Sequence, residues 1–317
     1  MKIRRTEQLD YENVEISSND FLIVASGYEV RSTFILESLL KRNTSLPKIY
    51  VLSFKDKYTS NNVQNDTFYT DNNCEIFEAA PNSSREILAI LKKVLQKLDS
   101  YGIQRKIFVD ISSMSRVWYG SILSYLNVVQ SDVPFSITFF YSLALYEPPI
   151  YNEKTGLRIE PLQEYVNISI PDKPSALIIG LGYNKNQAYG IKESLDVEEI
   201  ILFCTDKSSN ADYYLEVKKQ NSDLLKIVDP NNIIYYPIMD IKYTENLVHN
   251  ICKRLSDGFR IILAPCGPKI FTFLCFIIAN LLDDIDIWRI TTVSYSNSKP
   301  SERRPSGKIL AYKISYE

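Results

Sequence analysis

The segments FLIVASGYEVRS (residues 21–32) and ALIIGLGYNKNQ (residues 176–187) decide the fold, because each joins an apolar strand to a helix through a turn of small residues. Buried parallel strands have such uninterrupted apolar runs, and small residues let the backbone turn sharply. Tyr28 and Tyr183 occupy the same place in the two segments. The sequence therefore indicates one structural unit that occurs twice.

A second pair of segments repeats in the same order, KIFVDISSMSR (106–116) and RIILAPCGPK (260–269). Each is a strand followed by a small turn and a cation, Arg116 in the first half and Lys269 in the second. Apolar strands that alternate with amphipathic helices are typical of parallel sheets covered on both faces. The predicted fold class is α/β, with two tandem Rossmann-like domains, each a mostly parallel sheet with a terminal antiparallel hairpin.

Periodicity places the elements along the chain. The predicted parallel strands are 21–25, 48–54, 74–79, 106–112, 134–145, 176–181, 199–205, 232–237, 259–265 and 285–295. The predicted helices are 30–42, 83–99, 115–130, 184–195, 211–224, 242–256 and 268–282. Strands 165–170 and 308–315 are expected to close the hairpins, and the Asn-rich segment 55–73 is expected to be a loop with at most a short helix. The proline-rich link 171–175 predicts domains 1–172 and 173–317.

Composition excludes several classes of function. The 317 residues carry a formal net charge of −2, without the basic excess of a dedicated duplex nucleic-acid binder. The N-terminus lacks a signal-peptide core, and the longest apolar run, Ile270–Leu282, is too short to span a bilayer. Five cysteines without C-x-x-C spacing and a single histidine predict no metal site. We expect a cytoplasmic protein with reduced thiols, no membrane association and no cofactor.

The candidate site lies in the turns after the first and fourth strand of each unit. In doubly wound sheets, ligands bind beyond the carboxyl ends of the strands, where the strand order reverses. Helix N-termini and arginine side chains in such turns suit anions. The sequence predicts a ligand held between the two domains, and the predicted ligand-binding residues are Ser26, Gly27, Tyr28, Glu29, Arg31, Asp110, Ser112, Ser113, Arg116, Gly182, Tyr183, Asn184, Cys266, Gly267 and Lys269.

Each of these residue types also has a structural explanation. Asp110 either orients a ligand hydroxyl or caps the following helix. For the nearby serines, helix capping is the favoured role. Glu29 and Arg31 form either an acid and phosphate clamp or a solvent-exposed ion pair. Tyr28 and Tyr183 either stack on a purine or cover the end of the sheet.

The turns with Ser112, Ser113 and Arg116, and with Cys266, Gly267 and Lys269, resemble the fourth-strand motif of the CARF superfamily. Two fused copies are similar to the SAVED arrangement, a pseudo-symmetric CARF pair. This resemblance implies Rossmann-like domains that sense a nucleotide, specifically a cyclic oligonucleotide, in prokaryotic antiviral defence. It also implies a separate effector chain as the partner, with little or no activity of the sensor alone.

Two other classes of function stay open at this point. The first is an enzyme that hydrolyses or transfers a nucleotide or nucleoside, with Glu29 and Asp110 as the candidate acid and base; no recognisable catalytic set is present. The second is a scaffold subunit of a larger complex, whose turns bind no ligand.

Overall fold

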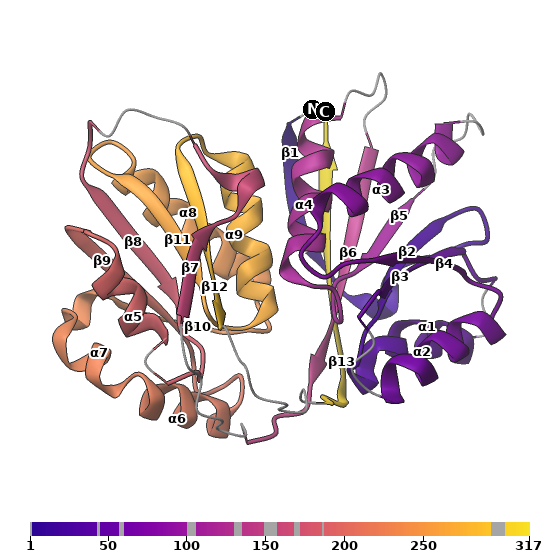
Figure 1. Ribbon diagram of the computed structural model, residues 1–317, viewed down its shortest axis with the longest axis horizontal. Helices are drawn as coiled ribbons and strands as arrows, with labels where there is room; N and C mark the ends of the chain where they lie inside the picture. Colours follow the sequence, from indigo (N-terminus) through magenta and orange to yellow (C-terminus); the bar gives the residue numbers. More distant parts are fainter. Residues whose placement is uncertain are drawn as a thin grey trace. The chain divides into compact units, whose positions relative to one another are not determined.

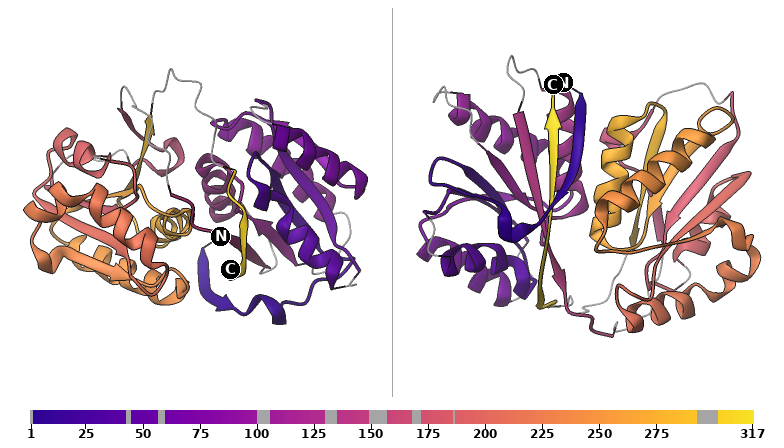
Figure 2. Two further views of the ribbon diagram at one scale, coloured as in Figure 1. Left: turned by 90° about the horizontal axis from the view of Figure 1, so that it is seen from below. Right: turned by 180° about the vertical axis from the view of Figure 1, so that it is seen from behind.

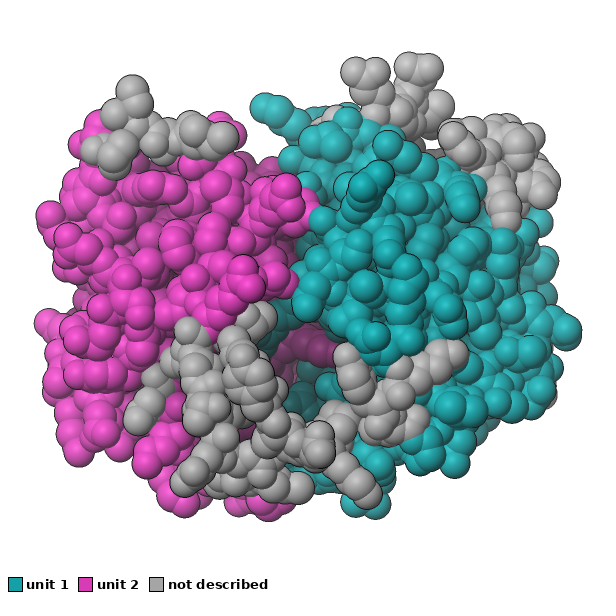
Figure 3. Space-filling view, viewed as in Figure 1, with its two compact units in different colours: residues 1–147, 299–317 teal, residues 148–298 magenta. Residues whose placement is uncertain are grey.

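The computed structural model describes residues 2–42, 45–56, 60–99, 106–129, 135–148, 157–167, 172–185, 187–292 and 302–317. The chain divides into two compact units, which Figure 3 distinguishes by colour. Unit 1 comprises residues 1–147 and 299–317, and unit 2 comprises residues 148–298. Each unit contains one mostly parallel sheet with an antiparallel edge or near-edge strand, so the predicted α/β class is confirmed.

Unit 1 contains a seven-stranded sheet (Figure 1). Its strands are β1 (Ile3–Leu9), β2 (Phe21–Ser26), β3 (Lys48–Phe54), β4 (Glu75–Ala79), β5 (Ile107–Asp110), β6 (Phe135–Ala144) and β13 (Pro305–Tyr316). Its α-helices are α1 (Phe34–Lys41), α2 (Ser60–Asp71), α3 (Ser84–Asp99) and α4 (Arg116–Val128), and its 3-10 helices are η1 (Tyr11–Asn13) and η2 (Val30–Thr33).

Unit 2 contains a six-stranded sheet. Its strands are β7 (Leu157–Pro161), β8 (Ser175–Gly180), β9 (Glu199–Thr205), β10 (Ile233–Tyr236), β11 (Arg260–Pro265) and β12 (Ile285–Thr292). Its α-helices are α5 (Gln187–Ser194), α6 (Ala211–Gln220), α7 (Ser222–Ile227), α8 (Ile241–Leu255) and α9 (Lys269–Leu281), with the 3-10 helices η3 (Gln163–Tyr165) and η4 (Pro230–Asn232).

The two sheets share one strand order. Unit 1 contains the order β6-β5-β2-β3-β4, and unit 2 contains β12-β11-β8-β9-β10. If the parallel strands are numbered within each unit, both orders are 5-4-1-2-3, that of a doubly wound sheet. The order reverses between the first and fourth strands, which are β2 and β5 in unit 1 and β8 and β11 in unit 2. The turns that the sequence singles out therefore do lie at the point of reversal.

The antiparallel strand beside each last parallel strand comes from the other half of the sequence. β6 pairs with β13, and β12 pairs with β7. The sequence predicts instead that each last parallel strand pairs with the strand that follows it directly. The structure corrects both assignments: residues 308–315 belong to β13 in the first sheet, and β7 supplies the strand of the second sheet. Of the predicted strand 165–170, residue 165 ends η3 and residues 168–170 lie outside the described residues.

The predicted boundary at residue 172 consequently differs from the two observed units. The chain passes between the units twice, after Glu147 and before Lys299. A division at residue 172 would assign β7 to the first domain and β13 to the second. The proline-rich link marks a break between strands, but backbone pairing decides which sheet a strand joins.

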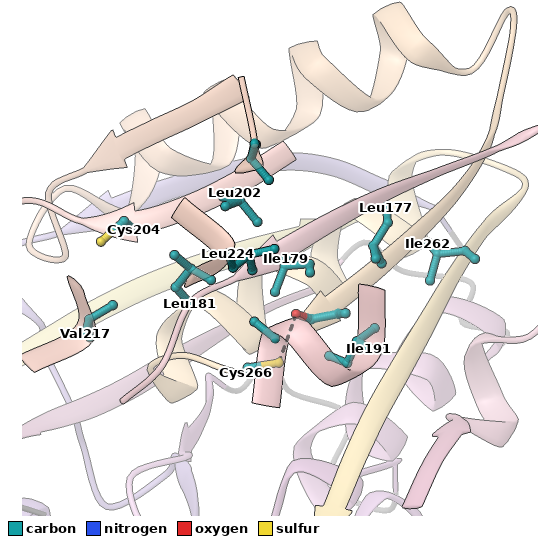
Figure 4. Packing of buried hydrophobic residues seen from close by; sticks show 13 residues of the cluster. Leu177, Ile179, Leu181, Ile191, Leu202, Cys204, Val217, Leu224, Ile262 and Cys266 are labelled. Carbon is teal, nitrogen blue, oxygen red and sulfur yellow. Dashed lines mark hydrogen bonds between the residues drawn. The ribbon is translucent and has the colours of Figure 1, made fainter. Parts of the chain in front are cut away.

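Helices cover both faces of each sheet, because alternate residues of a strand face opposite layers. In β9, Leu202 and Cys204 belong to a buried cluster with residues of α5, α6 and α7 (Figure 4). Phe203, which lies between them, contacts Phe271 of α9 with their ring centroids 5.3 Å apart. In unit 1, Phe54 of β3 likewise stacks on Trp118 of α4, with centroids 4.1 Å apart.

The Asn-rich segment 55–73 contains the twelve-residue helix α2 rather than a loop with a short helix. Its buried residues are Asn62, Asn65 and Tyr69, so the buried face is polar and shows no apolar stripe in the sequence. Two of these side chains donate hydrogen bonds to the backbone of the turn after β2. The helix is therefore held by polar contacts that the apolar periodicity of the sequence does not report.

The two ends of the described chain lie side by side (Figure 2), where Ile3 of β1 pairs with Tyr316 of β13. All five cysteines are free thiols. In the described part of the chain, we find no helix with both the length and the apolar character needed to span a membrane.

Candidate functional site

The carboxyl edge of the unit 1 sheet brings together the turn after β2 and the turn after β5. A Cβ atom built on Gly27 would lie 3.3 Å from Cβ of Ser113 and 3.4 Å from the Phe54 ring. The Gly27 N–H donates to Ser32 Oγ, which itself donates to the Ala25 carbonyl. The two predicted turns of this unit are thus in direct contact at the point where the strand order reverses.

Glu29 and Arg31 form an ion pair inside unit 1. Arg31 Nε donates to Glu29 Oε2 at 2.7 Å, and its Nη1 donates to the Ser142 carbonyl at 2.5 Å. Glu29 is 5% exposed and Arg31 is 0% exposed, so the pair is buried. One of the two alternatives from the sequence was instead a solvent-exposed pair. The guanidinium also lies over the Tyr141 ring, 5.2 Å from its centroid. Burial by itself lowers the pKa of Arg31, but Tyr141 and Glu29 outweigh it and raise the pKa above its usual value, so the side chain is a permanent cation.

Asp110 organises the turn after β5. Its Oδ1 accepts hydrogen bonds from the backbone N–H of Ser112 at 2.9 Å and from the Ser112 hydroxyl. Ser112 Oγ in turn accepts from the Ser142 N–H at 2.7 Å. The cap of α4 is Ser115, whose Oγ accepts from the Trp118 N–H. Asp110 is therefore a turn-stabilising residue, and Ser115 is the helix cap.

Four buried polar atoms of this same edge have no hydrogen-bond partner among the described residues: Ser26 Oγ, Arg31 Nη2, Ser113 Oγ and Ser142 Oγ. Ser26 ends β2, Ser113 follows β5 and Ser142 lies in β6, so the hydroxyls come from three adjacent strands. Most buried polar groups in folded proteins are satisfied by protein, water or ligand. We call these four residues the polar cluster.

The N–H groups at the start of η2 are occupied by the chain itself. The Val30 N–H donates to the Glu302 carbonyl, and the Arg31 N–H donates to the Arg303 carbonyl at 3.2 Å. The Leu145 N–H donates to the Arg304 carbonyl on the other side of this segment. These two helix N–H groups, which the sequence suggested for anion binding, are therefore already bonded.

A buried asparagine holds the glycine turn of each unit in the same way. Asn65 of α2 donates to the Gly27 carbonyl at 2.8 Å, and Asn221 donates to the Gly182 carbonyl at 2.7 Å. Each asparagine follows the second parallel strand of its unit, 38 residues after Gly27 and 39 after Gly182. This matched contact adds structural support to the internal duplication.

In unit 2, the predicted turns press against each other. A Cβ atom on Gly182 would lie 2.2 Å from the Cys266 carbonyl oxygen, and one on Gly267 would lie 2.6 Å from the Leu181 carbonyl oxygen. The Cys266 thiol is buried and points to the Ala264 carbonyl, 3.6 Å away (Figure 4). Here the small residues permit the close approach of two backbones.

Gly182→Ala is expected to destabilise the protein by about 1–3 kcal/mol, because the new methyl group overlaps the Cys266 carbonyl and forces the turns apart. Urea unfolding would measure the loss. Gly258→Ala is the matched control, since a Cβ there meets no atom within 4 Å. Equal stabilities of the two variants would show that the turn contact is not tight.

The remaining predicted residues lie on or near these turns. Tyr28 is half-buried, and its carbonyl accepts from Asn61; Tyr183 packs edge-on against Tyr213, with centroids 5.8 Å apart. Asn184 Nδ2 donates to Gln187 at the start of α5.

Arg116 and Lys269 are the first residues of α4 and α9, and both are half-buried. An aromatic residue follows each of them two positions later, Trp118 and Phe271 respectively. In unit 2, this ring packs against Gly180, the last residue of β8, since a Cβ there would lie 2.3 Å from Phe271.

Sequence reasoning missed three residues of these edges: Ser142, Asn65 and Asn221. Ser142 is the polar residue in the otherwise apolar run FFYSLALY, which was the available signal. Asn65 and Asn221 lie in polar segments. The signal that distinguishes them in the sequence is their nearly equal separation, in residues, from Gly27 and Gly182. Within the described residues, no group of three or more histidine, cysteine, aspartate or glutamate side chains is placed to hold a metal ion.

Comparison with known proteins identifies no family. No protein-family model matches the chain, and no curated protein matches it in sequence. Among solved structures, the chain is similar to a protein from Pseudomonas aeruginosa UCBPP-PA14 that is named as a universal stress protein. The match has 9% sequence identity, covers 86% of this chain and 92% of the other, and has a TM-score of 0.25. A similarity at this level transfers neither a site nor an activity.

Proposed function

We propose that unit 1 is a nucleotide-binding module whose ligand contacts the polar cluster at the carboxyl edge of its sheet. The observation that carries this proposal is the presence of four buried polar atoms without partners at the point where the strand order reverses. Doubly wound sheets bind their ligands at this point. Leaving a buried polar group unpaired costs free energy, so a ligand that pairs these atoms gains what the free protein lacks.

The structural hydrogen bonds of the same turns support this reading. Ser32, Ser112 and Ser115 all have their hydroxyls in hydrogen bonds that shape the turns. The polar cluster adds hydroxyls that hold nothing in place.

The site favours binding over catalysis. Glu29 accepts a hydrogen bond from Arg31, and Asp110 accepts two from Ser112. These are the two carboxylates that hydrolysis would need as acid and base. Since both are engaged in holding the turns, we propose a sensor or regulatory subunit rather than an enzyme.

A more specific form of the proposal is that the ligand is a cyclic oligonucleotide and that its binding is read by a separate effector chain in antiviral defence. Its support is the resemblance of the turns at Arg116 and Lys269 to the CARF motif. Cyclic and linear nucleotides therefore belong in the same ligand panel, so that a preference between them is measured directly.

Thermal unfolding of the full chain with this panel tests the proposal. A ligand at a hundredfold excess over its dissociation constant adds about 2.7 kcal/mol of stability, which is a clear shift in Tm. We expect Arg116→Ala to weaken binding about tenfold or more, because a charge-assisted hydrogen bond to phosphate is lost. Lys226→Ala is the control, since Lys226 lies on the surface in an exposed ion pair.

Two results would count against the proposal. If no nucleotide shifts Tm, the scaffold alternative gains support. If mass spectrometry shows that the bound nucleotide is consumed, the module is an enzyme and not a sensor.

A further inference from the structure

Among the described residues of this edge, the buried charged side chains are one cation and two carboxylates. Arg31 is the buried cation, and Glu29 and Asp110 are buried carboxylates, 5% and 1% exposed. Together these three groups have a formal charge of −1. The field of Asp110 reaches beyond its own turn: after burial, it is the next largest cause of the raised pKa of the Tyr69 hydroxyl. An anion at the cluster would therefore meet a guanidinium already paired with Glu29 and an additional carboxylate.

Desolvation reinforces this charge argument. The ion pair is buried on both sides, and Arg31 already uses Nε for Glu29 and Nη1 for the Ser142 carbonyl. Its Nη2 has no hydrogen-bond partner in the part of the chain that the structure describes. A phosphate would have to lose its hydration and would gain one N–H of a neutralised cation, so burial of a phosphate here is unfavourable.

The free atoms of the cluster instead match an uncharged polar group. Serine hydroxyls both donate and accept hydrogen bonds, and Arg31 Nη2 donates. Three hydroxyls and one N–H are complementary to a group that itself has donors and acceptors close together. The ribose diol and the edge of a nucleobase are such groups, whereas a phosphate offers acceptors alone.

We infer that the polar cluster binds the uncharged nucleoside part of the ligand, with its hydroxyl or amide groups, and that the phosphate lies outside the cluster. This inference rests on the proposed nucleotide-binding function and assigns its orientation. One alternative from the sequence places a phosphate at Arg31. The charge balance instead assigns a neutral group of the ligand to Arg31. Ser142, which the sequence did not single out, becomes a ligand-contacting residue.

Isothermal titration of the full chain with ribonucleosides, their 5′-monophosphates, ribose 5-phosphate and inorganic phosphate tests this orientation. We expect nucleosides to bind about as tightly as the monophosphates, and inorganic phosphate neither to bind nor to compete. Ribose 5-phosphate distinguishes whether the uncharged group in the cluster is the sugar or the base. Binding of ribose 5-phosphate indicates the sugar, and no binding of ribose 5-phosphate indicates the base.

Ser142→Ala and Thr205→Val form a matched pair of variants. Both remove a buried hydroxyl that has no partner within the described residues, one in the cluster and one at the end of β9 in unit 2. Because no protein hydrogen bond is lost, both variants are expected to fold. Ser142→Ala should weaken nucleoside and nucleotide binding equally, by about two- to tenfold, as expected for one uncharged hydrogen bond. Thr205→Val should leave both affinities unchanged.

Three results would overturn the inference, and they differ in what they mean for the function. Tight nucleotide binding with no nucleoside binding and competition by inorganic phosphate would place the phosphate in the cluster and keep the proposed function. Nucleoside binding that Ser142→Ala does not change would place the ligand elsewhere. The absence of binding by every nucleotide and nucleoside would remove the proposed function itself.

Discussion

A protein that consists of residues 1–172 is expected to be unfolded, whereas residues 148–298 are expected to fold by themselves. The first fragment contains β1 and β6 but lacks β13, the strand that lies between them and pairs with both. It loses the buried side chains Leu310, Tyr312, Ile314 and Tyr316. At about 1.5–3 kcal/mol for each large apolar side chain, this loss is comparable to the whole net stability of a domain, about 5–15 kcal/mol. The second fragment contains all six strands of its sheet.

Circular dichroism and urea unfolding of the two fragments would test this expectation. The informative control joins residues 1–147 to residues 299–317 through a short glycine-serine linker. The two segments to be joined lie side by side near the junction, since the Leu145 N–H donates to the Arg304 carbonyl at 2.9 Å. We expect this joined protein to fold. Cooperative unfolding of residues 1–172 alone would show that β13 is dispensable.

Glu29→Gln is expected to destabilise the full chain by about 3–5 kcal/mol, because the variant leaves the guanidinium of Arg31 buried without a counter-charge. The two side chains are 6% and 0% exposed, so water cannot replace the lost carboxylate. Glutamine keeps the size of the side chain, which limits the change to the charge. Chemical unfolding monitored by tryptophan fluorescence would give the loss, and Trp118 reports on the same unit.

Two further variants make this measurement decisive. Asp223→Asn breaks the Lys226–Asp223 pair, whose side chains are 74% and 70% exposed, and should change stability by less than about 0.5 kcal/mol. The double variant Glu29→Gln/Arg31→Met removes both charges and should recover part of the loss, since the unpaired cation is its main cause. If Glu29→Gln were as mild as Asp223→Asn, the pair would not be buried in solution.

Most of the fold can be predicted from local sequence patterns. The apolar runs that open each unit, and the helices from Arg116 and from Lys269, agree with the observed elements because a strand or helix buries its own apolar face. The reversal of strand order between the first and fourth strands agrees with the expectation for a doubly wound sheet. The partner of the last strand cannot be predicted in this way. The sequence predicts residues 165–170 as a strand and misses β7, and pairing between distant parts of the chain decides which sheet β7 and β13 join.

The candidate site shows the same division between local and distant effects. Ser26, Arg31 and Ser113 lie at the predicted edge because strand ends determine their place. The environment of Arg31 differs from the solvent-exposed ion pair that the sequence allowed, since its side chain points inward to Glu29 and to the Ser142 carbonyl of another strand. The bracing contacts of Asn65 and Asn221 also come from distant segments. A single sequence reports where a turn lies but not which side chains of other elements fill it.

The pairing of the two chain ends determines how the protein would respond to tension. Strands β1 and β13 are antiparallel, and Lys2 and Glu317 exchange both backbone hydrogen bonds at their outer end. A force applied between the two termini would therefore load these bonds one after another, as a zipper is opened, rather than all at once. The first strand to be pulled away would be the edge strand β1, because β13 is also paired with β6 on its other side. A partner attached to both termini would therefore transmit force directly to the sheet of this unit.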